Sequence, residues 1–384
     1  MSIKCEKLFQ RIEELKKEYI DFWVDVCNIE SPTEYKEGVD RVGNFIGEKA
    51  RKRGWEIEIQ EQPISGNCVC ITMNPDVDAQ PICFSGHMDT VHPVGSFGEV
   101  PTHCDGEKIY GPGVCDCKGG IVSAFLAMAA LEDIGFKTRP VKLLLQSDEE
   151  NSSRFSNKST VDFMCRKAQN CIAFLNGEPM QKGTATVLRK GISKYSFEVT
   201  GKASHASNCT NGISAICEAA HKIIELEKMK DAEGITCSCG LINGGTAENT
   251  VPEKCTFTTD IRFNNIEEML QADAVVNEVA ATSYVTGSSC QVTLKSRRIA
   301  MECTDRNMAL LEQLNVIYAE NDLETLKGRK RAGGSDAAEV TAYGIPCLDS
   351  FGVVGGAIHE RGEWASLESL TYSAKLLAAA AYCL

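Results

Sequence analysis

The chain has 384 residues, of which 43% are hydrophobic and 24% are charged, and its net charge is −13. These values are typical of a globular protein with two or three domains. The acidic balance disfavours nucleic acid and anionic membranes as partners, because both select basic surfaces.

The first twenty residues are charged throughout and lack the apolar core of a signal peptide. No apolar run reaches the ~18 residues that a membrane helix needs. The run 376–382 is shorter and is better explained as the end of a buried helix. We therefore expect a cytoplasmic protein.

The chain contains 19 cysteines, an odd number for a disulfide scaffold. Most lie in apolar segments, where a reduced cysteine packs as a small hydrophobic residue. Three Cys-x-Cys pairs occur, at 68–70, 115–117 and 237–239. Structural zinc usually requires two Cys-x2-Cys pairs, so we favour packed thiols in a reducing cytosol.

In chain order, hydrophobic periodicity first predicts two amphipathic helices, then strands, and then a loop rich in glycine and proline that opens a third helix. The helices are expected over 1–31 and 35–54, the strands over 56–60, 67–73 and up to His87, the loop over 110–120, and the third helix over 121–134. The apolar run 141–146 predicts a central parallel strand, and a short strand follows over 171–175.

The pattern changes near residue 190, where apolar and polar residues begin to alternate. The expected order is strand 192–200, helix 212–230, strands 235–242 and 254–263, helix 266–281 and strand 291–296. This βαββαβ order is typical of a ferredoxin-like module. We therefore expect an inserted domain at 191–297, with the first domain at 1–190 and 298–384.

The first domain then resumes with a helix over 307–321. A second helix is opened by 332–338, a strand follows over 345–349, and a last helix begins near 367. The predicted fold class is α/β, with a central mixed, mostly parallel sheet and an inserted α+β domain.

Side chains that can bind metals follow several separate strand ends. They are His87, Glu149 with Glu150, Glu178 and His359, and Asp116 lies in the glycine-rich loop. The carboxyl ends of parallel strands form the crevice where sites develop, so we expect these groups to meet. One acidic pair alone would commonly be solvated, but this set can hold two zinc ions with one bridging carboxylate.

Five motifs give this sequence a family resemblance. They are Gly-His-Met-Asp-Thr-Val at 86–91, Asp-Cys-Lys-Gly-Gly at 116–120, Ser-Asp-Glu-Glu at 147–150, Glu-Pro at 178–179, and His359. With them the chain resembles, over nearly its whole length, the di-zinc aminoacylase and carboxypeptidase family. That family includes glutamate carboxypeptidase, acetylornithine deacetylase and succinyl-diaminopimelate desuccinylase. The resemblance implies a phosphorylase/hydrolase-like catalytic domain with a lid and dimerisation domain inserted.

The resemblance also implies two Zn²⁺ per chain, and a mixed site of this kind accepts Co²⁺ or Mn²⁺ as well. It places His87 with Glu178 on one ion and Glu150 with His359 on the other. Asp116 would bridge the two ions and is often followed by a cis peptide in the family.

Two further roles at this site follow from the same resemblance. Glu149 would be the general base, and Asp89 would orient His87 through its other ring nitrogen.

The inserted domain matches the family as well. Gly-Lys-Ala-Ser-His-Ala at 201–206 resembles the lid-domain motif whose histidine, in relatives, stabilises the oxyanion at the partner subunit's site. The resemblance gives the oxyanion role to His205, and the sequence leaves open whether it acts in its own site or in that of the partner subunit. Asn249 and Arg262 match positions facing the substrate carboxylate. Gly333 lies in Gly-Gly-Ser-Asp, which resembles a segment of the glutamate carboxypeptidase branch. Arg331 could bind a substrate carboxylate or could be a plain solvated charge.

The resemblance therefore implies a homodimer formed through the inserted domain. The two-domain organisation suggests that this domain closes on substrate about a hinge near residues 190 and 297.

The sequence departs from the family pattern at two places. Gly-Pro-Gly at 111–113 stands where many relatives have Gly-Arg-Gly, and Cys117 stands where Asp or Met is usual. The Cys117 thiol could contact the metals or oxidise, although we favour a packed inert thiol. His92, His103 and His221 match no ligand position and are expected to be ordinary supporting or surface residues.

The predicted function is hydrolysis of a peptide or amide bond beside a free carboxylate, as in glutamate carboxypeptidase, on a small peptide or N-acyl amino acid. An N-acyl-amino-acid deacylase or dipeptidase with the same site is the alternative among enzymes. A non-catalytic binding relative is disfavoured because all five ligands and Glu149 are present. A cysteine-rich metal-buffering protein would bind many more than two ions per chain.

Overall fold

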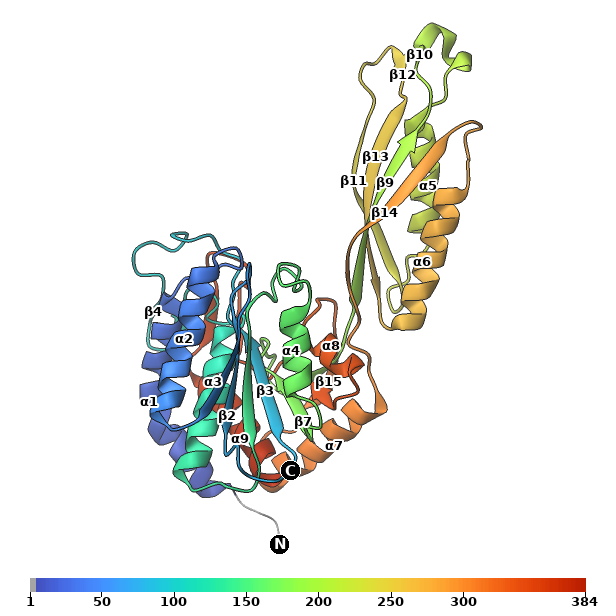
Figure 1. Ribbon diagram of the computed structural model, residues 1–384. Coiled ribbons are helices and arrows are strands. Elements are labelled where there is room, and N and C mark those ends of the chain that lie inside the picture. Colours follow the sequence, from blue (N-terminus) through green and yellow to red (C-terminus); the bar gives the residue numbers. More distant parts are fainter. Residues whose placement is uncertain (1–4) are drawn as a thin grey trace. The chain divides into compact units, whose positions relative to one another are not determined.

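A computed structural model describes residues 5–384, which form two compact units (Figure 1). The first unit runs to Val187 and also contains Cys303–Arg329 and Ser335–Leu384. The second contains Leu188–Glu302 and Lys330–Gly334, where the sequence placed an insertion at 191–297. The role of the second unit as a lid and dimerisation domain stays a prediction.

A six-stranded mixed sheet forms the centre of the first unit, in the order β1-β2-β6-β3-β7-β16. The strands β6, β3, β7 and β16 run parallel, and β1 and β2 add antiparallel strands at one edge. The bounds are β1 (Glu56–Gln60), β2 (Cys68–Met73), β6 (Val141–Gln146), β3 (Ile82–His87), β7 (Ala173–Asn176) and β16 (Cys347–Leu348). The predicted fold class is confirmed.

Helices cover both faces of this sheet (Figure 1). One face packs through Val69, Ile71, Phe84, Leu143 and Leu145 into a large apolar core. That core is shared with α1 (Glu6–Asn28), α2 (Lys36–Lys52), α3 (Lys118–Asp133), α7 (Asp305–Glu320) and α9 (Glu368–Cys383). The shorter helices α4 (Ser159–Lys167) and α8 (Ala337–Ala342) cover the opposite face.

The interior of the first unit explains two apolar stretches of the sequence. Almost every side chain of α3 is buried, and the alanine run at 378–381 in α9 is buried as well. Small residues let these two helices pack closely in the core. Among residues 5–384, no helix combines the length and the apolar character needed to cross a membrane.

The second unit is a four-stranded antiparallel sheet with two helices, in the chain order expected from the sequence. Its strand order is β11-β13-β9-β14. The elements are β9 (Gly191–Thr200), α5 (Ala215–Glu227), β11 (Thr236–Gly244), β13 (Lys254–Phe263), α6 (Ile266–Ala281) and β14 (Ser289–Arg298). The side chains that alternate along β9 and β13 form its core with residues of α5 and α6.

Several short elements were not predicted. One is α4, which has only nine residues and follows Lys158 in the left-handed conformation, without a capping side chain. The others are short strands: β4 (His103–Cys104), β5 (Lys108–Tyr110), β17 (Gly355–Gly356) and β18 (Trp364–Ser366) form one sheet, β8 (Thr184–Arg189) pairs with β15 (Lys327–Arg331), and β10 (Ser204–His205) pairs with β12 (Thr250–Val251). Most of these strands have only two or three residues, which carry too little periodicity to be recognised, and β15 contains no apolar residue. The expected helix start at residues 1–4 lies outside the described residues.

A close approach between α3 and the end of β7 fixes the position of the loop before α3. A Cβ atom on Gly120 would lie 2.0 Å from the carbonyl oxygen of Gly177. Only glycine therefore allows the first turn of α3 to pack against the chain that leaves β7.

We predict that Gly120→Ala destabilises the first unit by roughly 1–3 kcal/mol, because the methyl group would collide with backbone that cannot rotate away. All three tryptophans, Trp23, Trp55 and Trp364, lie in the first unit, so their fluorescence during urea unfolding measures the effect. The control is Gly47→Ala in α2, where the nearest atom is 3.6 Å from the added Cβ. The free energy of unfolding of that variant should rise by about 0.5–1 kcal/mol. Equal urea midpoints for the two variants would contradict the packing argument.

Candidate metal centre

The candidate site forms where three neighbouring parallel strands end. His87 is the last residue of β3, the central strand of the three. Glu149 and Glu150 follow the end of β6 on one side, and Glu178 follows the end of β7 on the other. Parallel strands present their carboxyl ends at one edge, which is why residues far apart in the sequence meet there.

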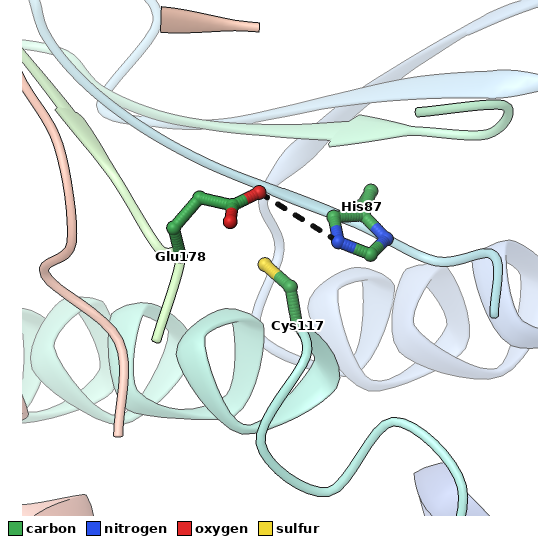
Figure 2. Close-up of side chains that lie close together, drawn as sticks. All are labelled: His87, Cys117 and Glu178. Atoms are coloured by element: carbon green, nitrogen blue, oxygen red, sulfur yellow. Dashed lines mark ion pairs between the residues drawn. The ribbon is translucent and has the colours of Figure 1, made fainter. Parts of the chain in front are cut away.

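Asp116 lies between two histidines. Its Oδ1 atom is 3.0 Å from Nε2 of His87, and its Oδ2 atom is 3.3 Å from Nε2 of His359. His359 Nε2 is also 3.2 Å from Oε2 of Glu150. On the other side, His87 Nε2 is 3.7 Å from Oε1 of Glu178 (Figure 2). The two oxygens of one carboxylate therefore face two different histidines. The two sides adjoin, because ligand atoms of His87, Asp116 and Glu150 also lie within 4.8 Å of one another.

This donor set fits two divalent cations. Ligand atoms on one tetrahedral ion, bound at 2.0–2.3 Å, lie roughly 3.3–3.8 Å apart, which is close to the spacings observed. Asp116, Glu150 and Glu178 carry like charges in a largely buried site, and buried charge is costly unless it is paired. Imidazole and carboxylate ligands together suit Zn²⁺, Co²⁺ or Mn²⁺.

The shifted pKa values of the metal-free site also indicate that positive charge is stabilised there. Hydrogen bonds to Asp116 and Glu150 raise the pKa of His359 to about 10. Burial raises the pKa of Glu150 to about 7. Burial also opposes ionisation of Asp116, but hydrogen bonds from His359 and His87 hold its pKa below the usual range. An imidazolium at His359 thus occupies the place of a cation.

Asp89 fixes the turn that carries the two glutamates. Its carboxylate accepts hydrogen bonds from the backbone N–H groups of Glu149 and Glu150, at 3.2 and 3.1 Å, and from the Thr33 hydroxyl at 2.7 Å. His87 Nδ1 lies 3.0 Å from the Asp89 carbonyl oxygen and 3.4 Å from its carboxylate. The side chain of Asp89 therefore braces the Glu149–Glu150 turn as well as facing His87.

Glu363 is a supporting residue that the sequence did not reveal. Its buried carboxylate accepts hydrogen bonds from the backbone N–H groups of Gly113, Cys115 and Asp116, at 3.2, 2.8 and 3.0 Å. It therefore holds the loop that presents Asp116. Glu363 lies four residues after His359, and nothing in the sequence distinguishes it from the exposed Glu360.

The remaining histidines have other surroundings. His92 is buried, with Nε2 3.8 Å from Glu363 Oε2 and its ring against Phe97. The rings of His103 and His221 stack on Tyr110 and Tyr284, respectively. None of the three belongs to a candidate metal cluster among the described residues.

In the second unit, His205 and Asn249 are neighbours. The β10–β12 pair sets His205 opposite Thr250, and the N–H of Ala206 donates to the carbonyl oxygen of Asn249 at 2.8 Å. His205 and Asn249 are both exposed. The backbone N–H of Ser207 donates to Nδ1 of His205 at 3.2 Å, which leaves Nε2 to carry a proton.

The other three predicted residues of this unit gather at a different place. Arg262 donates from Nη1 to the carbonyl oxygen of Ala332 at 2.8 Å, and Gly333 and Arg331 are the neighbours of Ala332 in sequence. Arg262 lies near the end of the ten-residue strand β13, whereas Asn249 precedes its start. A strand of this length spans about 30 Å, so the two groups lie at opposite ends of the second unit.

Comparisons with known proteins show the family of this chain. Residues 83–382 match the model of Peptidase family M20/M25/M40. Carboxypeptidase G2 of Pseudomonas sp. (strain RS-16) is 24% identical over 94% of this chain and 88% of its own length. A succinyl-diaminopimelate desuccinylase of Wolbachia pipientis (strain wPip) is 26% identical over 83% of this chain and 82% of its own.

Solved structures share the fold. Aminopeptidase PepT of Bacillus cereus superposes with a TM-score of 0.80 at 21% identity, covering 96% of this chain and 98% of its own. A metallo-carboxypeptidase of Sulfolobus solfataricus, Sso-CP2, superposes with a TM-score of 0.70 at 15% identity, covering 95% of this chain and 98% of its own.

We predict that Zn²⁺ binding to the metal-free chain at pH 7 releases protons. Because the pKa of His359 is about 10, its ring is protonated at pH 7, and a ligating imidazole must lose that proton. Zn²⁺ affinity should therefore rise between pH 7 and 10 and fall in acid. Calorimetry in two buffers of different ionisation enthalpy measures the release. His359→Gln should release fewer protons and His103→Gln as many as the wild type, whereas buffer-independent heats would refute the assignment.

We also predict that Glu363→Gln lowers Zn²⁺ affinity by roughly 10- to 100-fold, as loss of a ligand's support typically does. The amide would place an NH₂ group against one of the backbone N–H donors of the Asp116 loop. Competition with a chromophoric chelator measures the affinity, and Glu360→Gln, an exposed change in the same loop, is the control. An unchanged affinity for Glu363→Gln would show that the loop needs no such support.

Proposed function

Because this chain belongs to Peptidase family M20/M25/M40 and is thereby a metal-dependent hydrolase, we propose that it cleaves a peptide or amide bond next to a free carboxylate at a two-metal site. The observation that carries the proposal is the division of Asp116 between His87 and His359. A carboxylate whose two oxygens face two ligand groups is suited to bridge a pair of metal ions.

The proposed ligands form two sets that share Asp116. His87 and Glu178 complete one set, and Glu150 and His359 complete the other. Zn²⁺ is the proposed ion in both sites, and Co²⁺ or Mn²⁺ suits the same ligands. When bound, such a pair of ions polarises the carbonyl group of the scissile bond and lowers the pKa of a water molecule to about 7.

Glu149 is the proposed general base. Its side chain is buried beside the ligands, and its backbone is fixed by the hydrogen bond to Asp89. It accepts a proton from the attacking water and returns that proton to the leaving amine. Glu150, the next residue, faces His359 instead, so the two adjacent carboxylates divide the roles of base and ligand.

The exposed Nε2–H of His205 is the proposed donor to the developing oxyanion. Arg262, Arg331 and Gly333 are proposed to bind the free carboxylate, and Asn249 to assist beside His205. Since the two groups lie at opposite ends of one second unit, His205 would act at the site of a second copy of the chain.

The proposed homodimer forms through the second unit, at the edge of its sheet. β11 is an edge strand of its sheet, and Leu241 and Ile242 on it are 71% and 55% exposed. Unpaired strand edges with exposed apolar side chains favour pairing with another chain.

The proposed substrate is an acylated glutamate or a small peptide with a free C-terminal carboxylate, by similarity to carboxypeptidase G2. The alternative is deacylation of another N-acyl amino acid, or dipeptide cleavage at the same site. The similarity to a succinyl-diaminopimelate desuccinylase favours that alternative.

We predict that the Zn²⁺-loaded chain hydrolyses one member of a panel of acyl-glutamates, acetylated basic amino acids, N-succinyl amino acids and dipeptides. Glu149→Gln should lower kcat roughly 10²- to 10⁴-fold while two metals per chain are retained, because the amide cannot accept the proton. Release of the free amine measures the rate, and metal analysis measures the binding.

The matched control is Glu312→Gln, an exposed change on α7, which should leave kcat unchanged. Full activity in Glu149→Gln would exclude Glu149 as the base. Turnover that survives complete removal of metal would exclude the two-metal mechanism.

A further inference from the structure

Cys117 lies inside the candidate metal centre rather than in an apolar part of the core. Its sulfur and the ligand atoms of His87 and Glu178 all lie within 4.8 Å of one another, and all three residues are buried. Figure 2 shows the Cys117 thiol directed to the space between the His87 ring and the Glu178 carboxylate. No other cysteine among residues 5–384 belongs to such a cluster.

The surrounding backbone fixes the position of the Cys117 thiol between His87 and Glu178. Cys117 directly precedes α3, whose first turn is pressed against Gly177 through the close approach of Gly120. The Cys117 thiol donates to the Gly177 carbonyl oxygen at 3.2 Å. A Cβ on Gly86 would lie 3.1 Å from the sulfur, so the absence of a side chain there makes room for it.

The sulfur thus lies between the carboxyl ends of β3 and β7. These are the two strand ends from which His87 and Glu178 come.

Cys115 shows what an ordinary buried cysteine looks like in the same loop. Its sulfur is 3.9 Å from the carbonyl oxygen of Val353 and packs against Gly355. No histidine or carboxylate shares a metal cluster with it among the described residues. Two cysteines separated by one residue are therefore placed in chemically different surroundings.

We propose that Cys117 is a protein ligand, as a thiolate, of the metal ion held by His87, Glu178 and Asp116. This proposal rests on the two-metal centre proposed above. The thiol proton passes to solvent as the sulfur–metal bond forms, so no oxidant or reductant takes part. A zinc–sulfur bond is ~2.3 Å long, and forming it would replace the hydrogen bond from the Cys117 thiol to the Gly177 carbonyl oxygen.

The added ligand makes the two metal positions unequal. The position at His87 has four protein ligands, as structural zinc sites do, whereas the position at His359 has three and keeps an open place. A thiolate also favours soft ions such as Zn²⁺ and Cd²⁺ over Mn²⁺. One ion is therefore held tightly, and the other exchanges and faces the substrate.

Cobalt spectroscopy tests the proposal directly. Co²⁺ titrated into the full metal-free chain should give an intense near-ultraviolet sulfur-to-cobalt charge-transfer band with the first equivalent. Cys117→Ser and Cys117→Asp should lose this band, and Cys115→Ser should retain it. In Cys117→Asp the preference for Cd²⁺ over Mn²⁺ should fall by roughly 10- to 100-fold, the usual scale for perturbed metal sites.

X-ray absorption of the wild-type chain loaded with one Zn²⁺ provides a second measurement that requires no variant. A sulfur shell at ~2.3 Å is expected, and a shell of nitrogen and oxygen alone would overturn the proposal. Binding of two Co²⁺ without the charge-transfer band would also overturn it and would leave the hydrolase function standing. Failure to bind any Co²⁺ would overturn both the proposed metal centre and the role of Cys117.

Discussion

The candidate site of the first unit depends on the convergence of three carboxylates, Asp116, Glu150 and Glu178, at one largely buried sheet edge. Like charges in such a place are unfavourable unless positive charge accompanies them. In the metal-free chain His359 supplies part of that charge as an imidazolium. A bound cation would therefore stabilise the site. Without one, the convergence of these carboxylates lowers the stability of the fold.

Two buried carboxylates outside the candidate ligand set, Asp89 and Glu363, hold this arrangement in place. The Asp89 carboxylate accepts hydrogen bonds from backbone N–H groups just after β6. The Glu363 carboxylate accepts them from backbone N–H groups of the loop before α3. Charged acceptors make strong hydrogen bonds to backbone N–H groups. Each loop is thus fixed by one side chain, which sets the direction of Glu149, Glu150 and Asp116. The glycine contact at Gly120 adds the steric part of the same constraint.

The second unit separates its proposed functional residues along β13. His205 and Asn249 lie beyond one end, and Arg262 lies at the other, next to the Ala332 carbonyl. A rigid antiparallel sheet cannot bring its two ends together. If both groups act at one site, as we propose, that site needs two copies of the chain, and the exposed edge of β11 is the surface proposed to join them.

The sequence by itself determined the α/β class, the longer helices and strands, and the strand ends that carry His87, Glu149, Glu150 and Glu178, because hydrophobic periodicity and parallel topology are local or regular signals. Strands such as β5 were missed because they contain too few residues for a period, and α4 was missed because no capping side chain marks its start. Only the tertiary structure decided which oxygen of Asp116 faces which histidine, that Glu363 holds the Asp116 loop, and that the sulfur of Cys117 points at His87 and Glu178 while that of Cys115 does not. These facts depend on contacts between segments as far apart as 250 residues, and no local sequence pattern predicts how such segments meet.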